Sequence, residues 1–186
     1  MFVCVCYLRL EMSSSSERTG VIDLTSSMHH LRDVSFCARI CKVNSRIHVA
    51  LSERRFDNET ERWVLTEYQF FMSPKAWKSF TSRADDVDAI LSRPHLFPHR
   101  EIIFYEGEGG RKLSMYCKYA SNGPGVLFER FHLSNADEEF GKRTAVLFMP
   151  HQVFKKLITL FPRINDELFY ALATASMLFS FQNDVW

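Results

Sequence analysis

The chain has 186 residues, of which 46% are hydrophobic and 14% aromatic, so it can bury a sizeable core and is neither disordered nor fibrous. Its 23 Lys and Arg residues nearly balance 22 Asp and Glu residues, which gives a net charge of +1. A uniformly basic surface for a polyanionic partner is therefore excluded. Any nucleic-acid site must be a local patch.

Cysteine usage bears on the compartment. The five cysteines are odd in number and lack the dense, even pattern of a disulfide-stapled secreted domain, which favours a reducing compartment: nuclear, cytoplasmic or viral. Cys37 and Cys41 lie near His29 and His30, but this spacing is not typical of zinc ligands. We therefore expect buried thiols, with no metal and no other cofactor.

The two ends of the chain are apolar, but neither predicts a membrane segment. Met1–Leu10 lacks the flanks of a signal peptide and is followed by serine-rich sequence, so residues 1–34 are predicted to form a flexible leader. Leu168–Phe181 is shorter than the roughly 20 residues that a spanning helix requires. It predicts a helix that is buried or covered by a partner.

Residues 35–92 are predicted to form a first sheet–helix module. Runs of β-branched and aromatic residues with alternating polarity indicate strands. Ser73 and Pro74 are typical of a helix N-cap and first turn, and a helical apolar face continues to Leu91. The predicted elements are strands at Ser35–Val43, Arg46–Phe56 and Glu61–Met72 and a helix at Pro74–Leu91.

After a linker containing Pro94 and Pro98, residues 100–186 are predicted to form a second module. It has the same succession of strands and then helices, and Gly107–Lys112 is interpreted as a turn, not as a phosphate-binding loop. The predicted strands are Glu101–Glu106, Arg111–Ala120, Val126–Leu133 and Lys142–Phe148, and the predicted helices are Pro150–Leu160 and Ile164–Phe181.

The two modules end alike. Phe70–Trp77 matches Val146–Val153 with an offset of 150 − 74 = 76 residues, and Val87–Leu91 matches Ile164–Leu168 with an offset of 164 − 87 = 77. This predicts a duplicated unit with one residue inserted in the helical segment. The predicted fold class is α+β, with two tandem strand–strand–strand–helix modules whose antiparallel sheets share one topology.

This order of strands, acidic turn and helix start resembles the DNA-binding domain of the transcriptional coactivator positive cofactor four, a Whirly-like single-stranded DNA-binding fold. The resemblance covers Ser35–Leu91 and Lys112–Leu168. It implies that the helices starting at Pro74 and Pro150 pack about a pseudo-two-fold axis as an intramolecular pseudo-dimer. The helix contact is expected to bury Trp77, Phe80, Phe154 and Leu157. The second unit departs from the family pattern, with Val153 in place of Trp and Phe131 in place of a base.

The expected function is non-enzymatic binding of single-stranded DNA, melted duplex or RNA, with transcription or replication proteins as further partners and no membrane. Such binding needs cations along the phosphate path and flat side chains on which bases stack. We expect a monomer with internal pseudo-symmetry or a higher oligomer. The candidate binding residues are Lys42, Arg46, Arg54, Arg55, Arg62, Tyr68, Lys112, Tyr116, Lys118, Arg130, Lys142 and Arg143, with Phe56, Tyr119 and Phe128 as further possible platforms.

Each of these residues also has a plainer interpretation. A strand arginine is more often an edge residue or a cross-strand ion-pair partner, and strand aromatics more often belong to the core, as we expect for Trp63, Trp77 and Phe154. The alternative function is a protein-interaction or structural subunit, such as a virion or complex component. The near-zero net charge and Leu168–Phe181 favour it.

Overall fold

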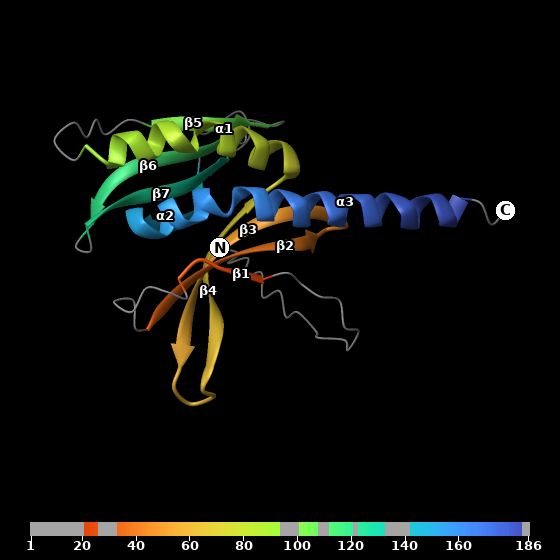
Figure 1. The fold of residues 1–186 in the computed structure, drawn as a ribbon, viewed down its shortest axis with the longest axis horizontal. Coiled ribbons are helices and arrows are strands. Elements are labelled where there is room, and N and C mark those ends of the chain that lie inside the picture. The colour runs from red at the N-terminus through yellow and green to blue at the C-terminus, as the bar shows by residue number, and fades with distance from the viewer. Residues whose placement is uncertain are drawn as a thin grey trace, which may run out of the picture.

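The computed structural model describes residues 21–25, 33–93, 101–107, 112–120, 123–132 and 142–183. In these residues the chain forms an α+β fold with two four-stranded antiparallel sheets and three helices (Figure 1). The first sheet has the order β1-β2-β3-β4 and the second the order β5-β6-β7-β8, so each is a meander of sequential strands.

The first unit follows the predicted boundaries closely. Asn44 and Ser45 have φ values of 49° and 64°, and two successive positive φ angles are what a two-residue hairpin turn requires. The hydroxyl of Ser73 accepts a hydrogen bond from the Ala76 backbone N–H at 3.2 Å, which caps the helix at its predicted start. Its elements are β1 (Val21–Asp23), β2 (Val34–Val43), β3 (Arg46–Asp57), β4 (Arg62–Met72) and α1 (Pro74–Leu91).

One strand was assigned to the flexible leader, and that assignment is wrong for residues 21–25. β1 pairs with β2, and Ile22 and Leu24 are 2% and 0% exposed. Three residues are too short for a periodic pattern to be visible in the sequence, but two buried side chains anchor the strand. The first unit therefore has four strands where three were predicted. The rest of the predicted leader, apart from Asp33 and Val34, lies outside the described residues.

The second unit differs from prediction at its helices. Pro150 ends β8 and occupies the N-cap position, so the helix starts one residue later than expected; Pro162 lies in the first turn of the last helix, where proline is tolerated. Its elements are β5 (Glu101–Glu106), β6 (Lys112–Ala120), β7 (Gly123–His132), β8 (Lys142–Pro150), α2 (His151–Thr159) and α3 (Phe161–Asn183).

The strand registers are consistent with a duplication. Ala38 pairs with Leu51 in the first sheet, and Met115 pairs with Phe128 in the second. The second pair lies 77 residues after the first on both strands, since 115 − 38 = 77 and 128 − 51 = 77. The buried helix positions follow the same offset. Ala76, Trp77, Phe80, Val87 and Leu91 correspond to Val153, Phe154, Leu157, Ile164 and Leu168.

The predicted one-residue insertion is therefore wrong. The offset is already 77 in the strands, so Pro150 corresponds to Ser73, and Trp77 corresponds to the equally buried Phe154 instead of Val153. The prediction had matched Pro74 with Pro150, but Pro74 lies in the first turn of α1 and Pro150 precedes α2. Proline is compatible with both positions.

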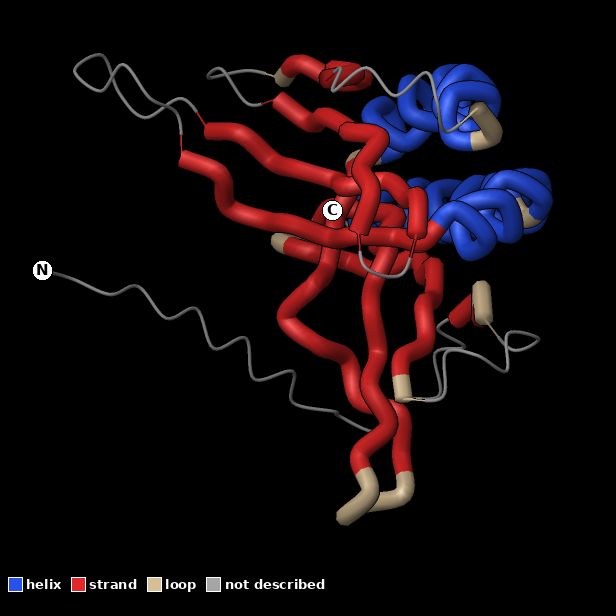
Figure 2. The backbone as a smooth tube through the Cα atoms, turned by 90° about the vertical axis from the view of Figure 1, so that its left-hand side faces the viewer, coloured by secondary structure: helices blue, strands red, loops and turns tan. Residues whose placement is uncertain are grey.

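The helices of the two units cross over between the sheets. α1 contacts β3 and β4 of its own sheet and also β5 and β6 of the other, while α3 returns to β2 and β3. All three helices lie together on one side of the strands (Figure 2). As predicted, α1 and α2 are in contact and bury four side chains, namely Trp77, Phe80, Phe154 and Leu157.

Two side-chain hydrogen bonds connect α1 to the helices of the second unit. The Trp77 indole N–H donates to the side-chain oxygen Oδ1 of Asn165 at 2.7 Å, and His151 Nε2 lies 2.6 Å from Asp88 Oδ1. Asp88 and Asn165 are again separated by 165 − 88 = 77 residues. Asp88 and Asn165 thus occupy equivalent repeat positions, although Trp77 and His151 do not. The buried side chains of both units form one continuous core.

Within the described residues, no helix combines the length and the apolar character that crossing a membrane would need.

Candidate nucleic-acid interface

Alternate side chains of the first sheet point to its two faces. On the covered face, residues such as Phe36, Val49 and Phe70 join the core beneath the helices. On the opposite face, which we call the outer face of the first sheet, small buried side chains form a floor: Ser35, Cys37, Ala50 and Ser52, all at most 4% exposed. The helices of the described residues lie on the other side of the strands (Figure 2), and the side chain of Arg54 reaches across this floor to Ser35.

Two arginines extend over the floor. Arg54 Nη2 donates to Asp23 Oδ2 at 2.7 Å and to Ser35 Oγ at 2.8 Å, and Arg39 Nη2 donates to Gln69 Oε1 at 2.6 Å. Among the described residues, Arg39 makes no ion pair with a carboxylate. Each guanidinium has five N–H donors, so the hydrogen bonds through Nη2 orient both arginines without using all of their donors, and the unpartnered Nε of each is buried.

Burial and hydrogen bonding set the protonation of this face. Burial alone would raise the pKa of Asp23, but hydrogen bonds from the Thr25 N–H and from Arg54 outweigh it and lower the pKa. The Asp23 carboxylate therefore stays charged and holds Arg54. Because this pKa is lowered on folding, the carboxylate stabilises the fold above its unfolded pKa near 3.8, and that stabilisation is lost as the pH falls through the folded value.

The three cysteines among the described residues, Cys37, Cys41 and Cys117, have raised pKa values and remain neutral thiols at physiological pH. Burial raises the pKa of Cys37 although Arg54 and Arg39 oppose the shift, and burial raises the pKa of Cys117 to about 11. Cys37 and Cys117 are buried, as predicted, whereas Cys41 is only half-buried. In the described part of the chain, no cluster of three His, Cys, Asp or Glu residues is placed to hold a metal.

Exposed aromatic rings lie beside Arg54, on the hairpin of β3 and β4 that projects beyond the rest of the sheet (Figure 1). Phe56 and Trp63 are 37% and 41% exposed, and their ring centroids are 5.5 Å apart in an edge-to-face arrangement. The Arg54 guanidinium carbon lies 5.8 Å from the centroid of the Trp63 ring, within cation–π range. The prediction that Trp63 belongs to the core is wrong, because the hairpin extends past the helix layer.

The predicted cations of the first unit are divided between the two sides of the sheet. Arg46 and Arg54 lie on the same side of β3 as Ala50 and Ser52, so they belong to the outer face. Lys42, Arg55, Arg62 and Tyr68 fall on the other side, by strand alternation and register. Arg55 also forms an ion pair with Glu53 at 3.2 Å. The structure therefore does not bring these predicted residues together as one site.

The predicted residues of the second unit are also divided. Tyr116 and Lys118 belong to the outer face of the second sheet, and Lys112 lies there in an ion pair with Glu106 at 3.4 Å. Arg130 faces the opposite side and donates to the Phe71 carbonyl of the first sheet at 3.1 Å. Lys142 and Arg143 pair in register with His132 and Phe131, but their side chains lie outside the described set.

Phe128 and Tyr119, the further residues expected to stack on bases, differ in exposure. Phe128 is fully buried in the core, so its suggested role in stacking is wrong. Tyr119 is 57% exposed but lies on the covered side of the sheet, because it is on the same side of β6 as Met115 and Cys117.

Arg39 was missing from the predicted site. The signal was present in the sequence, because Phe36, Ala38 and Ile40 form the apolar side of β2 and leave Arg39 on the other side. Arg39 lies alone in the middle of its strand, away from the clustered basic residues near the hairpins that the prediction used. Its importance becomes visible only when Gln69 and Arg54 from neighbouring strands are placed beside it.

No protein-family model matches the chain, and a search of curated proteins gave no match.

Proposed function

We propose that this chain binds single-stranded nucleic acid without enzymatic activity, on the outer face of the first sheet. The observation that carries the proposal is the meeting of oriented Arg39 and Arg54 with the exposed rings of Phe56 and Trp63. Arginines can contact successive phosphates, while an exposed aromatic ring offers a surface for any base. The site would therefore show little sequence preference.

The resemblance to positive cofactor four supports this proposal independently of the charges. We propose that the two sheet–helix units form a Whirly-like pseudo-dimer inside one chain, and that the ligand is single-stranded DNA or melted duplex, with RNA as an alternative. Roles in transcription or replication, with a nuclear location, follow from the same resemblance. The crossing of α1 and α3 between the sheets is the feature of the fold that fits such a pairing.

Salt dependence tests the proposal. The affinity of a fluorescently labelled oligothymidylate is measured between about 50 and 200 mM salt; each phosphate contact should contribute a slope of about −0.7 in log K against log salt. Two arginine contacts predict a slope of about −1.4 or steeper. A duplex of the same length should bind more weakly, because its bases are not available to stack on Trp63.

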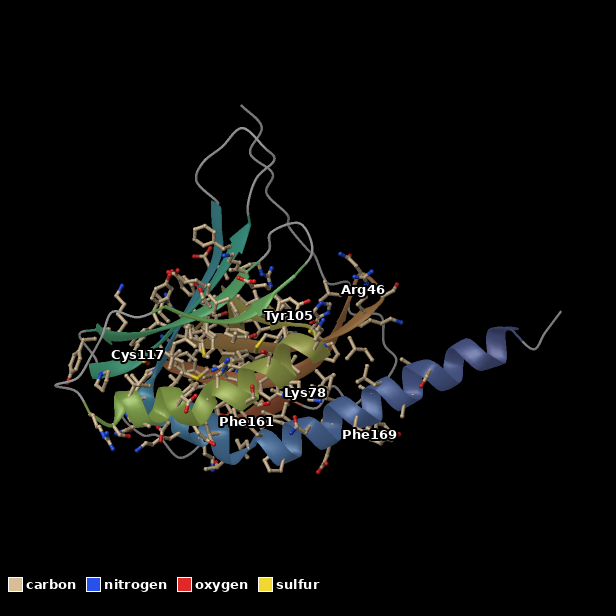
Figure 3. The ribbon with its side chains drawn as sticks, turned by 90° about the horizontal axis from the view of Figure 1, so that it is seen from above. Arg46, Lys78, Tyr105, Cys117, Phe161 and Phe169 are labelled. Atoms are coloured by element: carbon tan, nitrogen blue, oxygen red, sulfur yellow. The ribbon has the colours of Figure 1, made fainter. Side chains whose placement is uncertain are left out.

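A second candidate, protein interaction, is favoured by α3. Its C-terminal part runs beyond the sheets (Figures 1 and 3), and Phe169 and Tyr170 are 75% and 72% exposed. From Phe169 to Asn183 the sequence contains no charged residue. If the oligothymidylate does not bind at about 50 mM salt, where electrostatic binding is strong, nucleic-acid binding is rejected and the interaction role takes its place.

A further inference from the structure

The duplication allows the two outer faces to be compared position by position. With the 77-residue offset, Arg39 corresponds to Tyr116 and Arg54 corresponds to Phe131. Both equivalents belong to the outer face of the second sheet, because Tyr116 pairs with Leu127 and Phe131 with Lys112. The two oriented cations of the first sheet are thus replaced by two aromatic rings in the second.

The floors differ as well. Ser52, neutral and fully buried, corresponds to Glu129, which is 2% exposed. A carboxylate only accepts hydrogen bonds and has no proton to donate to a phosphate oxygen, whereas the serine hydroxyl can donate one. Among the basic residues whose side chains are described on the second outer face, Lys112 forms an ion pair with Glu106 and Lys118 lies near the end of β6; Arg143 pairs in register with Phe131, but its side chain lies outside the described set.

The flanking positions follow the same trend. Ala50 in the first floor corresponds to the larger Leu127, whereas Phe71 and Phe148 are the same residue type, so the leucine adds apolar surface beside Glu129. The Phe148 ring also lies over Gly125, where an added Cβ would meet ring carbon Cζ at 2.5 Å. Gly125 corresponds to His48 in the first sheet, so another polar position has been lost.

From these differences we infer that the two units have diverged in ligand chemistry: the first outer face binds the phosphate backbone of one strand, and the second binds no phosphate. The inference rests on the proposed function and specifies its stoichiometry, one short single strand per chain. It also specifies the residues that decide which sheet binds, namely positions 39, 52 and 54 and their equivalents 116, 129 and 131.

The test exchanges the residues of one unit for those of the other. In the variant Arg39→Tyr with Arg54→Phe, the first sheet carries the residues that the second sheet accommodates at the same register. Binding of an oligothymidylate of about ten nucleotides should weaken by about 100-fold or more, since each charge-assisted hydrogen bond contributes roughly tenfold. The matched control, Lys118→Ala on the second outer face, should change the affinity less than about threefold.

The reciprocal variant carries Tyr116→Arg, Glu129→Ser and Phe131→Arg. Titration at concentrations far above Kd should give one strand per chain for the wild type and two for this variant. The single substitution Arg39→Tyr, which leaves the Arg54–Asp23 pair intact, replaces the double variant if that one fails to fold.

Four outcomes would overturn the inference: two strands per wild-type chain, unchanged affinity after the Arg39 and Arg54 exchange, a loss for Lys118→Ala as large as for the exchange, or a folded reciprocal variant that still binds one strand. A wild-type chain that binds no oligothymidylate would instead reject the proposed function itself.

Discussion

The Phe80→Ala variant should lose about 3–5 kcal/mol of unfolding free energy, as is usual for a fully buried phenylalanine. Phe80 lies on α1, yet its ring contacts Phe104 and Phe128 of the second sheet and Phe154 of α2, with centroid distances of 5.6, 5.7 and 6.3 Å. Removing the ring therefore leaves a cavity where both units meet. Urea or guanidinium unfolding, followed by tryptophan fluorescence and circular dichroism, measures the loss.

The same variant tests whether the two units fold together. Because the core is continuous, both probes should report one coincident transition in the wild type and in Phe80→Ala. Phe169→Ala is the matched control, since this phenylalanine is 75% exposed and its removal should change stability by less than about 0.5 kcal/mol. Two separate transitions, with only the first unit destabilised, would contradict a shared core.

Local structure could be predicted from the sequence where the pattern was long. The helix Pro74–Leu91 and the strand Glu101–Glu106 have the predicted boundaries, because capping residues and periodicity act within the segment itself. β1 could not be predicted in this way. Its place depends on pairing with residues 37–39, which belong to a strand that begins eleven residues after it ends.

The residues of the candidate site could be predicted from the sequence only in part. Strand alternation shows which residues share a side, but the register between β3 and β4 shifts between Ser52 and Arg54. This irregularity changes which residues of β4 lie opposite Arg54, and no sequence signal marks it. The proposed site is consequently only partly on the predicted hairpin: Arg54 and Trp63 lie there, but Arg39 lies on β2. Arg55 and Arg62, which were predicted, fall on the other side of the sheet.

Trp63 shows why residue type alone was insufficient. A tryptophan in a strand is usually buried, and Trp77 is. Trp63 lies in the first half of β4, on the hairpin that projects beyond the helices (Figure 1), and its ring contacts Phe56 and Arg54 of the neighbouring strand. Trp63 is exposed and Trp77 is buried because β3 and β4 extend beyond the helices. The position of the strand ends relative to the helices depends on the tertiary fold.

The Trp63→Ala variant should therefore affect binding more than stability. If the ring stacks on a base, its loss should cost about 1–3 kcal/mol of binding free energy, equivalent to roughly 5- to 150-fold in Kd. The salt slope should stay unchanged, because no phosphate contact is removed. Kd and slope for labelled oligothymidylate, together with unfolding free energy, are the quantities to measure.

Val64→Ala provides the matched control for this last variant. Val64 is 49% exposed on the same hairpin but pairs with Arg55, so it faces the side opposite to Trp63. Its removal should leave Kd within about twofold, because the loss of a half-exposed side chain away from a site has small effects. Equal losses of affinity for both variants would indicate that the hairpin as a whole is perturbed. Unchanged affinity in a folded Trp63→Ala variant would move the stacking surface away from Trp63, and would leave Arg39 and Arg54 to bind the backbone alone.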